Sequence, residues 1–268
     1  MTDMHTAMDN ALNDETILPV VRNLIGNQGR FVTPRRVRVV VSHRYGRPVF
    51  FTVNNMKDRI HVNQMKGAFY EVQILEQLAP YMRAGGTFMD IGANVGNHSL
   101  YMLLIGGAAR AIQVEPNPDA LALLLSNMQL NGLMEQISLH SLGYGMGESD
   151  EGGFVIHSPK ANLGWARVKK ADEVAEGEGH HVSVRSGDSL LNGERVDFIK
   201  MDVEGMEIQA LRGLRKTLTE QKPPLFVEVD HKNTEAFNAL MDEYGYRVEL
   251  AFPDGKVNQN FLMLHKDA

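Results

Sequence analysis

The strongest constraint on the fold is a ten-residue stretch at 88–97 that combines a short apolar run, an acid and a glycine loop. Its sequence is FMDIGANVGN. An apolar run that ends in an acid and opens into glycines is typical of a buried strand that turns tightly into a helix. Glycines allow the backbone to approach a ligand closely, and the first helical turn offers free N–H groups. The stretch therefore predicts an α/β fold built around a nucleotide-type binding loop.

The segments that follow this loop alternate between helices and strands at close spacing. An apolar strand ends at Glu115, and a helix begins at Asn117 and closes at Gly132. This alternation predicts a Rossmann-like, mostly parallel sheet with helices on both faces and a closing antiparallel strand pair. The strands are expected at 88–90, 111–115, 137–140, 196–201 and 224–229, and the closing pair at 247–251 and 260–264.

Two segments interrupt the alternation. Residues 1–68 are predicted to form an N-terminal extension with a polar lead at 1–14, a short helix at 16–24 and a β-hairpin with strands at 37–41 and 48–53. Residues 69–268 form the predicted main domain, which begins with a helix at 69–82. Within it, residues 143–195 are rich in Gly, Glu and Ser, and they predict an insertion of short antiparallel strands or loops.

Composition excludes several classes of protein. The net charge of −6 argues against a nucleic-acid binder that relies on a basic surface. The absence of cysteine removes disulfides, thiolate nucleophiles and Cys-ligated zinc. There is no run of about 18 apolar residues, and the first 15 residues lack the apolar region of a signal peptide. We therefore expect a cytoplasmic protein without a membrane span.

The glycine pattern favours S-adenosylmethionine over a dinucleotide. A dinucleotide loop needs a second glycine close to the pyrophosphate, where this chain has Asn94. Asp90, two residues before Gly92, suits a cationic or amino group better than a phosphate, and S-adenosylmethionine carries an ammonium and a sulfonium. Glu115 lies 19 residues after Gly96 at the end of the next strand. A carboxylate there can accept both ribose hydroxyls.

At this level of detail the chain resembles the FkbM family of S-adenosylmethionine-dependent methyltransferases. The resemblance covers roughly residues 69–264, and its most distinctive block is VDFIKMDVEGME, because generic methyltransferase domains lack D-x-E-G-x-E after the fourth strand. The matching segments are 88–97, 114–118, 127–133 and 196–207, with Phe69, Tyr70 and Glu71 upstream. The resemblance implies a Rossmann-like methyltransferase fold and O-methylation of sugars, polyketides or other natural products.

Each candidate cofactor residue has an expected role. We expect Asp90, Gly92, Asn94 and Gly96 around the methionine moiety and Glu115 on the ribose. Glu71 is a candidate for the methionine end, although a surface glutamate explains it equally well. Asn117 would lie beside the ribose or only cap its helix. Leu142 and Gly143, just after the expected third strand, would flank the adenine.

The candidate catalytic residues follow the fourth strand. Asp202 is the first candidate for a general base or acceptor-positioning group, because strand ends meet at the switch point of such a sheet. Glu204 is the second, with helix capping as its alternative role. Asp202, Glu228 and Asp230 together offer hard oxygen ligands for Mg²⁺, although carboxylates at strand ends are common without a metal. Lys200, in a central strand, is expected to pair with Asp197 or with an acid from another strand.

The sequence leaves the acceptor open. The leading hypothesis is an O-methyltransferase acting on a small hydroxylated metabolite, sugar or natural product. An N-methyltransferase is the rival enzyme, because an amine needs only its lone pair to attack. A non-catalytic S-adenosylmethionine-binding protein is the rival outside catalysis, but it predicts loss of the strand-end acids. A small-molecule or glycan partner is expected, and a homo-oligomer is left open.

Overall fold

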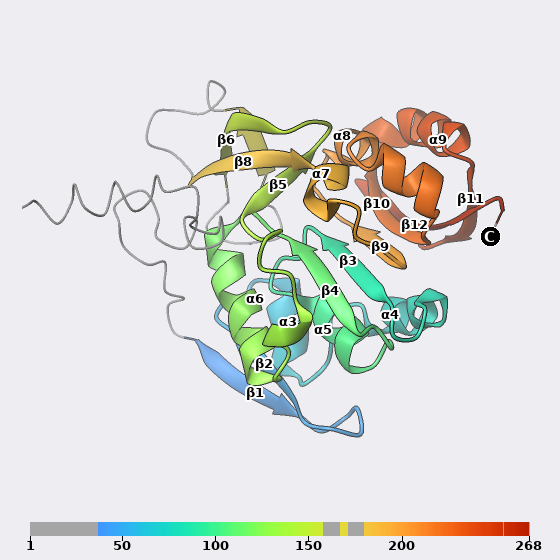
Figure 1. Ribbon diagram of the computed structural model, residues 1–268. Helices are drawn as coiled ribbons and strands as arrows, with labels where there is room; N and C mark the ends of the chain where they lie inside the picture. Colours follow the sequence, from blue (N-terminus) through green and yellow to red (C-terminus); the bar gives the residue numbers. More distant parts are fainter. Residues whose placement is uncertain (1–36, 158–166, 171–179, 254, 268) are drawn as a thin grey trace, which may run out of the picture.

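A six-stranded sheet runs through the middle of the molecule (Figure 1). The computed structural model describes residues 37–157, 167–170, 180–253 and 255–267, so the helix expected at 16–24 and the polar lead lie outside the described residues. The strand order is β11-β12-β10-β9-β3-β4. Its strands are β3 (Thr87–Ile91), β4 (Arg110–Val114), β9 (Phe198–Met201), β10 (Leu225–Asp230), β11 (Tyr246–Ala251) and β12 (Asn258–His265).

The sheet is parallel except at one end. Strands β4, β3, β9 and β10 are parallel neighbours, and β12 is antiparallel to both β10 and β11. The predicted Rossmann-like sheet with a closing antiparallel pair is therefore confirmed. Because all four parallel strands end at the same edge, the residues that follow them meet there.

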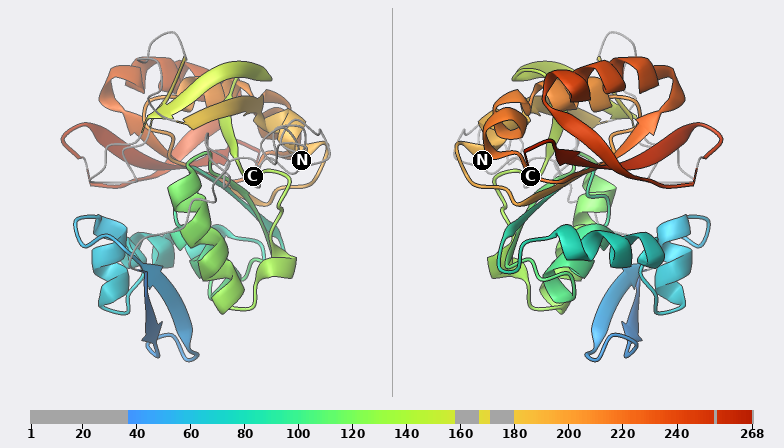
Figure 2. Two further views of the ribbon diagram at one scale, coloured as in Figure 1. Left: turned by 90° about the vertical axis from the view of Figure 1, so that its left-hand side faces the viewer. Right: turned by 90° about the vertical axis from the view of Figure 1, so that its right-hand side faces the viewer.

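Helices cover both faces of this sheet (Figures 1 and 2). On one face lie α4 (Val72–Leu78), α5 (Asn97–Leu104) and α6 (Pro118–Leu130); on the other lie α7 (Gly187–Leu191), α8 (Glu207–Arg212) and α9 (Thr234–Glu243). The described residues also form the short 3₁₀ turns η1 (Ala79–Tyr81), η2 (Met134–Gln136) and η6 (His231–Asn233) and the π-helix η5 (Thr217–Gln221). No helix in the described part of the chain is long and apolar enough to cross a membrane.

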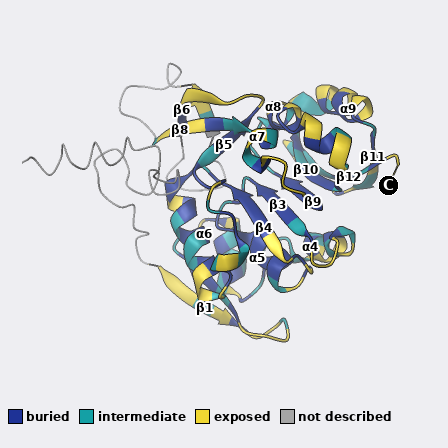
Figure 3. Cartoon of the chain, in the orientation of Figure 1, coloured by how far each residue is buried: buried dark blue, intermediate teal, exposed yellow. Residues whose placement is uncertain are grey.

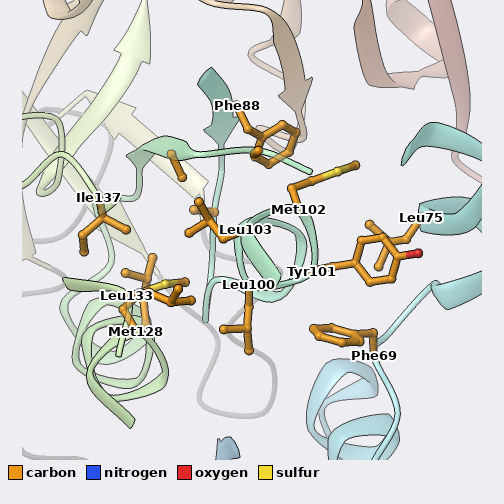
Figure 4. Close-up of a cluster of buried hydrophobic side chains, with 14 of the residues drawn as sticks. Phe69, Leu75, Phe88, Leu100, Tyr101, Met102, Leu103, Met128, Leu133 and Ile137 are labelled. Atoms are coloured by element: carbon orange, nitrogen blue, oxygen red, sulfur yellow. The ribbon is translucent and has the colours of Figure 1, made fainter. Parts of the chain in front are cut away.

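Alternating strand residues build a hydrophobic core on each face. Phe88 and Phe198 join the core beneath α4, α5 and α6, whereas Met89 and Ile199 join the core beneath α7, α8 and α9. Figure 4 shows part of the first core, with Phe69, Tyr101 and Met128 among its labelled side chains. Because both faces are covered, the central strands are almost entirely buried (Figure 3).

The N-terminal hairpin packs on the same side of the sheet as α6 (Figure 2). Strands β1 (Arg38–Ser42) and β2 (Val49–Val53) pair antiparallel, as predicted. Helix α3 (Arg59–Met65) follows, and its sequence RIHVNQM lacks the apolar periodicity that would have predicted it. The side chain of Asp58 begins the helix by accepting the backbone N–H groups of Ile60 and His61. Division of the chain at residue 68 stays a prediction.

The strand expected at 137–140 is wrong. Ile137 makes a single parallel bridge with Ala111, and the backbone N–H of Ser138 donates to the carbonyl of Ala111 at 3.0 Å. The chain then turns away from the sheet, because the Ser141 hydroxyl donates to the carbonyl of Ser138. The segment is too short to continue the ladder, so β4 forms the edge of the sheet.

The insertion folds as a separate four-stranded sheet in the order β5-β8-β6-β7. Its strands are β5 (Tyr144–Gly147), β6 (Glu151–His157), β7 (Arg167–Lys170) and β8 (His180–Ser186). Strand β6 is antiparallel to β7 and β8, but β5 and β8 are parallel. The sheet is therefore mixed, whereas the sequence predicted short antiparallel strands or loops.

Candidate cofactor and active site

A pocket lies where the carboxyl ends of β3, β4 and β9 face the inserted sheet. It encloses about 610 Å³ when the space open to solvent at its mouth is included. The main sheet contributes one wall and the inserted sheet contributes the other. The lining residues are Ile91, Gly92, Asn94, Val114, Glu115, Pro116, Gly145, Met146, Ile156, Val168, Asp202, Val203, Glu204 and Met206.

The glycine loop connects β3 to α5 through three left-handed residues: Gly92, Asn94 and Gly96, with φ of 73°, 50° and 79°. A Cβ at Gly92 would collide with the backbone carbonyl of Asp202. Glycine at this position therefore allows the segment after β9 to approach the loop. Gly92 and Asn94 line the pocket, whereas Gly96 faces Met128 on α6.

Glu115 is held by backbone N–H groups from both sides. Its Oε2 accepts from Asn94 and its Oε1 from Asn117, each at 2.7 Å. The residue is 7% exposed. Burial raises the pKa of Glu115 to about 7, although the two N–H groups oppose the shift. Because a carboxylate offers about four lone-pair sites, each oxygen retains an acceptor site for a ligand hydroxyl.

Asp90 and Lys200 form a buried ion pair beneath the loop. The two residues are register partners on β3 and β9, and Lys200 Nζ lies 3.4 Å from Asp90 Oδ1. Lys200 Nζ also donates to the carbonyl of Gly92 at 2.8 Å, and Asp90 Oδ2 accepts from the backbone and hydroxyl of Ser99. The expected pairing of Lys200 with an acid from another strand is confirmed. Asp197 instead binds Arg83 and Arg195.

Three carboxylates converge at the polar end of the pocket. Oxygens of Asp202, Glu204 and Glu228 all lie within 4.8 Å of one another. Desolvation and the neighbouring acids raise the pKa of Glu228 to about 8, and desolvation, partly offset by Lys200 4.0 Å away, raises the pKa of Asp202. Asp230, which the sequence offered together with Asp202 and Glu228 as a candidate magnesium ligand, pairs with Lys232 at 2.9 Å. This end of the pocket is therefore acidic, and Glu228 keeps its proton near neutral pH.

Glu71 approaches this acidic end from the loop before α4. It adopts a left-handed conformation with φ of 56°, and its Oε2 lies 3.5 Å from His98 Nε2. Burial would raise the pKa of Glu71, but hydrogen bonds from His98 and Tyr70 outweigh it and lower the pKa. His98 stacks on Phe226, as expected of a largely buried ring. Glu71 does not line the pocket, but its charge acts on Asp202 and Glu228.

Several sequence candidates lie behind the pocket wall. Asn117 caps α6 by accepting the backbone N–H of Asp119 at 3.1 Å. Leu142 is completely buried in the hydrophobic core, and the backbone N–H of Gly143 donates to the carbonyl of Glu115. Asp90 is completely buried as well. Their contacts are with the protein, and their expected roles toward a ligand stay predictions.

The inserted sheet supplies wall residues that the sequence did not indicate: Gly145, Met146, Ile156 and Val168. They belong to β5, β6 and β7. Strand β8 lies between β5 and β6, and β7 pairs with β6. The sequence signal for a buried strand here is the run of consecutive apolar residues Phe154, Val155 and Ile156. The apolar wall faces Glu115, so a ligand bound between them would contact both.

Comparison with known proteins identifies the family. A model of the methyltransferase FkbM domain matches residues 90–248. The chain belongs to the FkbM methyltransferase family. The matched residues include the end of β3, the glycine loop, Glu115, the whole inserted sheet and the acidic cluster, so the FkbM domain contains the pocket described above.

The individual relatives are distant. The chain is 25% identical over 171 residues to hexuronic acid methyltransferase AglP of Haloferax volcanii, an alignment that covers 63% of this chain and 65% of AglP. It is 26% identical over 185 residues to methyltransferase 1 of Beauveria bassiana, covering 62% of this chain and 74% of that protein. The chain thus spans just under two thirds of the length of AglP. A crystal structure of methyltransferase FkbM from Methylobacillus flagellatus KT matches with a TM-score of 0.49 at 20% identity, over 70% of this chain and 50% of that one.

Proposed function

We propose that this FkbM-family chain is an S-adenosylmethionine-dependent methyltransferase and that the pocket holds the cofactor. The observation that carries the proposal is the placement of Glu115, at the carboxyl end of β4, directly against the glycine loop that follows β3. A carboxylate at this point of a doubly wound sheet suits the two hydroxyls of a ribose. Pro116 and the apolar wall of the inserted sheet are suited to the flat adenine.

The polar atoms of the pocket fit the methionine end of the cofactor. Asn94 Oδ1 is buried and accepts no hydrogen bond from any described residue. An unpaired acceptor in a pocket is costly, and a donor such as an ammonium would satisfy it. When bound, S-adenosylmethionine supplies an electrophilic methyl group on a sulfonium. The acidic end formed by Asp202, Glu204 and Glu228 is complementary to that positive charge.

We assign the role of general base to Asp202, with Glu204 as the second candidate. Asp202 follows β9 beside the loop, and 40% of its side chain remains exposed to the pocket. The raised pKa of Asp202 is closer to the pH at which the enzyme works than the ordinary value of an aspartate, and this suits a general base. In this role the Asp202 carboxylate accepts the proton of the acceptor hydroxyl as the oxygen attacks the methyl carbon. The acids also hold the hydroxyl in line with the methyl group.

The acceptor that best suits this site is a hydroxyl of an uncharged, polyhydroxylated compound such as a sugar. Several carboxylates around one point can accept from neighbouring hydroxyls, whereas they repel a carboxylate on the acceptor. The similarity to a hexuronic acid methyltransferase supports a sugar, but the acidic cluster argues against the uronic acid itself. An amine acceptor, and hence N-methylation, is the alternative that the same acids would accommodate.

Two measurements test this proposal. Calorimetry with S-adenosylmethionine, S-adenosylhomocysteine and NAD should show binding of the first two only; no binding of S-adenosylmethionine would refute it. Transfer of a tritiated methyl group should then be compared across a neutral hexoside, its uronic acid and the corresponding amino sugar. Acceptors should rank in the order hexoside, amino sugar, uronic acid.

Asp202→Asn is the variant that tests the base. It should retain cofactor affinity and reduce turnover by about 10²- to 10⁴-fold. Asp230→Asn, at the end of β10 but outside the pocket lining, is the matched control and should stay within about twofold of the wild type. Unchanged turnover in Asp202→Asn would remove Asp202 from this role. Loss of turnover in EDTA, restored by Mg²⁺, would instead assign the three acids to a metal ion.

A further inference from the structure

One asparagine ties the glycine loop to the N-terminal hairpin. Asn127 lies on α6 and is completely buried. Its Nδ2 donates to the backbone carbonyl of Val95 at 2.8 Å. Its Oδ1 accepts from the backbone N–H and the hydroxyl of Thr52 on β2, each at 2.7 Å. The side-chain amide therefore bridges two segments that are 43 residues apart along the chain.

The bond to Val95 falls at the part of the loop that determines its shape. Val95 lies between the left-handed residues Asn94 and Gly96. On one side, Glu115 accepts the backbone N–H of Asn94; on the other, Asn127 donates to the carbonyl of Val95. Two buried side chains thus fix the orientation of the peptide groups on either side of the Asn94–Val95 peptide.

The residue that follows the loop also binds the N-terminal part of the chain. Asn97, the first residue of α5, accepts the backbone N–H of Tyr70 at 3.1 Å and donates to its carbonyl at 3.0 Å. Tyr70 immediately precedes Glu71, which lies beside His98. The hairpin and the segment before α4 therefore contact the back of the loop through two amides.

We propose that Asn127 is a positioning residue, which holds the glycine loop in its cofactor-binding shape by coupling it to the hairpin. The inference rests on the proposed role of the pocket as the S-adenosylmethionine site. Without the Nδ2 donor, the Val95 carbonyl loses its partner and the adjoining left-handed residues lose a restraint. The loop then samples other conformations, and the cofactor must select the competent one.

The chain contains a matched control at the end of the same helix. Asn131, the residue directly after α6, accepts the backbone N–H of Phe50 at 3.0 Å and donates to its carbonyl at 2.8 Å. It therefore docks the same strand, β2, with the same chemistry, but has no hydrogen bond to the glycine loop. Asn127 and Asn131 separate support of the hairpin from support of the loop.

The experiment measures cofactor affinity and loop protection in both variants. Asn127→Ala should weaken S-adenosylmethionine binding about tenfold by calorimetry and should speed amide hydrogen exchange in residues 92–97 of the ligand-free protein. Asn131→Ala should lower the melting temperature but leave affinity within about twofold and loop exchange unchanged. Asn127→Ser serves as the second variant if Asn127→Ala does not fold.

The outcomes distinguish this inference from the proposed function. If the wild type does not bind S-adenosylmethionine, the proposed function fails, although loop exchange still tests the tie. If the wild type binds, equal affinities in all variants overturn the positioning role. Equal weakening in Asn127→Ala and Asn131→Ala also overturns it, because that result would reflect hairpin docking alone.

Discussion

Glu115 is a buried carboxyl group that also accepts two backbone hydrogen bonds, and these two conditions shift its pKa in opposite directions. Burial against the pocket wall raises its pKa to about 7, although Asn94 and Asn117 each donate a backbone N–H to it. A carboxylate at this position is the better acceptor for two ribose hydroxyls, but the ligand-free protein destabilises that charge. At the residue scale, the protonation of one side chain therefore links pH to both stability and binding.

Glu115→Gln should remove the contribution of Glu115 to the pH dependence of protein stability. In the wild type, the pKa of Glu115 in the folded state lies above the ordinary value of about 4.5, so the unfolded chain loses this proton first as pH rises. The contribution of Glu115 to the free energy of unfolding is therefore complete below about pH 4.5 and is lost by about pH 7, a change of about 3 kcal/mol. In the wild type, S-adenosylmethionine affinity should rise between pH 6 and 8.

Comparison of the two proteins isolates this residue from other titrating groups such as Glu228. Urea unfolding from pH 4.5 to 8 should give a shallower loss of stability in Glu115→Gln. Calorimetry should show weaker binding with little dependence on pH. Parallel pH curves for the two proteins would contradict the assignment.

At the element scale, the two central strands β3 and β9 are joined by charge as well as by backbone hydrogen bonds. Strand β9 places Lys200 beside Asp90 of β3, and the lysine also binds the carbonyl of Gly92. Burial opposes the charge of the lysine, but Asp90 and Asp202 outweigh it and raise the pKa of Lys200. The pair fixes the carboxyl ends of two neighbouring strands directly beneath the pocket.

Lys200→Met should destabilise the protein by about 3–5 kcal/mol, because it leaves the Asp90 charge buried without its partner. Adding Asp90→Asn to this variant should restore most of the loss, since the amide can still accept from Ser99 without a buried charge. The measurement is the free energy of unfolding in urea at pH 7. If the double variant is as unstable as the single one, the pair is not the source of the effect.

At the scale of the whole molecule, the pocket exists only because two sheets face each other. The main sheet supplies the loop and the acids, and the inserted sheet supplies an apolar wall from Met146, Ile156 and Val168. The hairpin, on the other side of the loop, contacts α6 and not the pocket. Segments that are distant in the sequence therefore form the two facing walls of one pocket.

Val168→Ala tests the inserted sheet as part of the cofactor site. Removing two methyl groups from the wall should weaken S-adenosylmethionine binding about 3- to 10-fold, because each buried methylene contributes about 0.8 kcal/mol. Lys169→Ala is the control, since its exposed side chain lies on the opposite face of β7. Calorimetry measures the S-adenosylmethionine affinity of both variants. Equal affinities in the two variants would show that the cofactor does not contact this wall.

The sequence predicted much of the fold because its signals are local. The apolar runs that became β3, β4 and β9, the capping Asn117 and the hairpin are each set by a few consecutive residues. The failed strand at 137–140 shows the limit of such signals. Its alternating residues suit an edge strand, but whether the chain continues along β4 depends on the turn at Ser141.

The residues of the candidate site were likewise predicted only in part. Gly92, Asn94, Glu115, Asp202 and Glu204 were predicted and do line the pocket, because they follow strands whose ends must meet in a parallel sheet. Leu142 and Gly143 do not line it, and Gly145 and Met146 do. That shift follows from the missing third strand, which changes where the chain reaches the pocket.

The sequence by itself determined the family, the parallel sheet and the residues at its carboxyl edge, since motif spacing and strand ends are properties of consecutive residues. Only the tertiary structure decided that Lys200 pairs with Asp90, that Glu204 and not Asp230 joins Asp202 and Glu228, and that Asn127 binds the loop. These contacts depend on strand register and on how helices and sheets pack. Register and packing are set by the burial of the whole core, which no local pattern specifies.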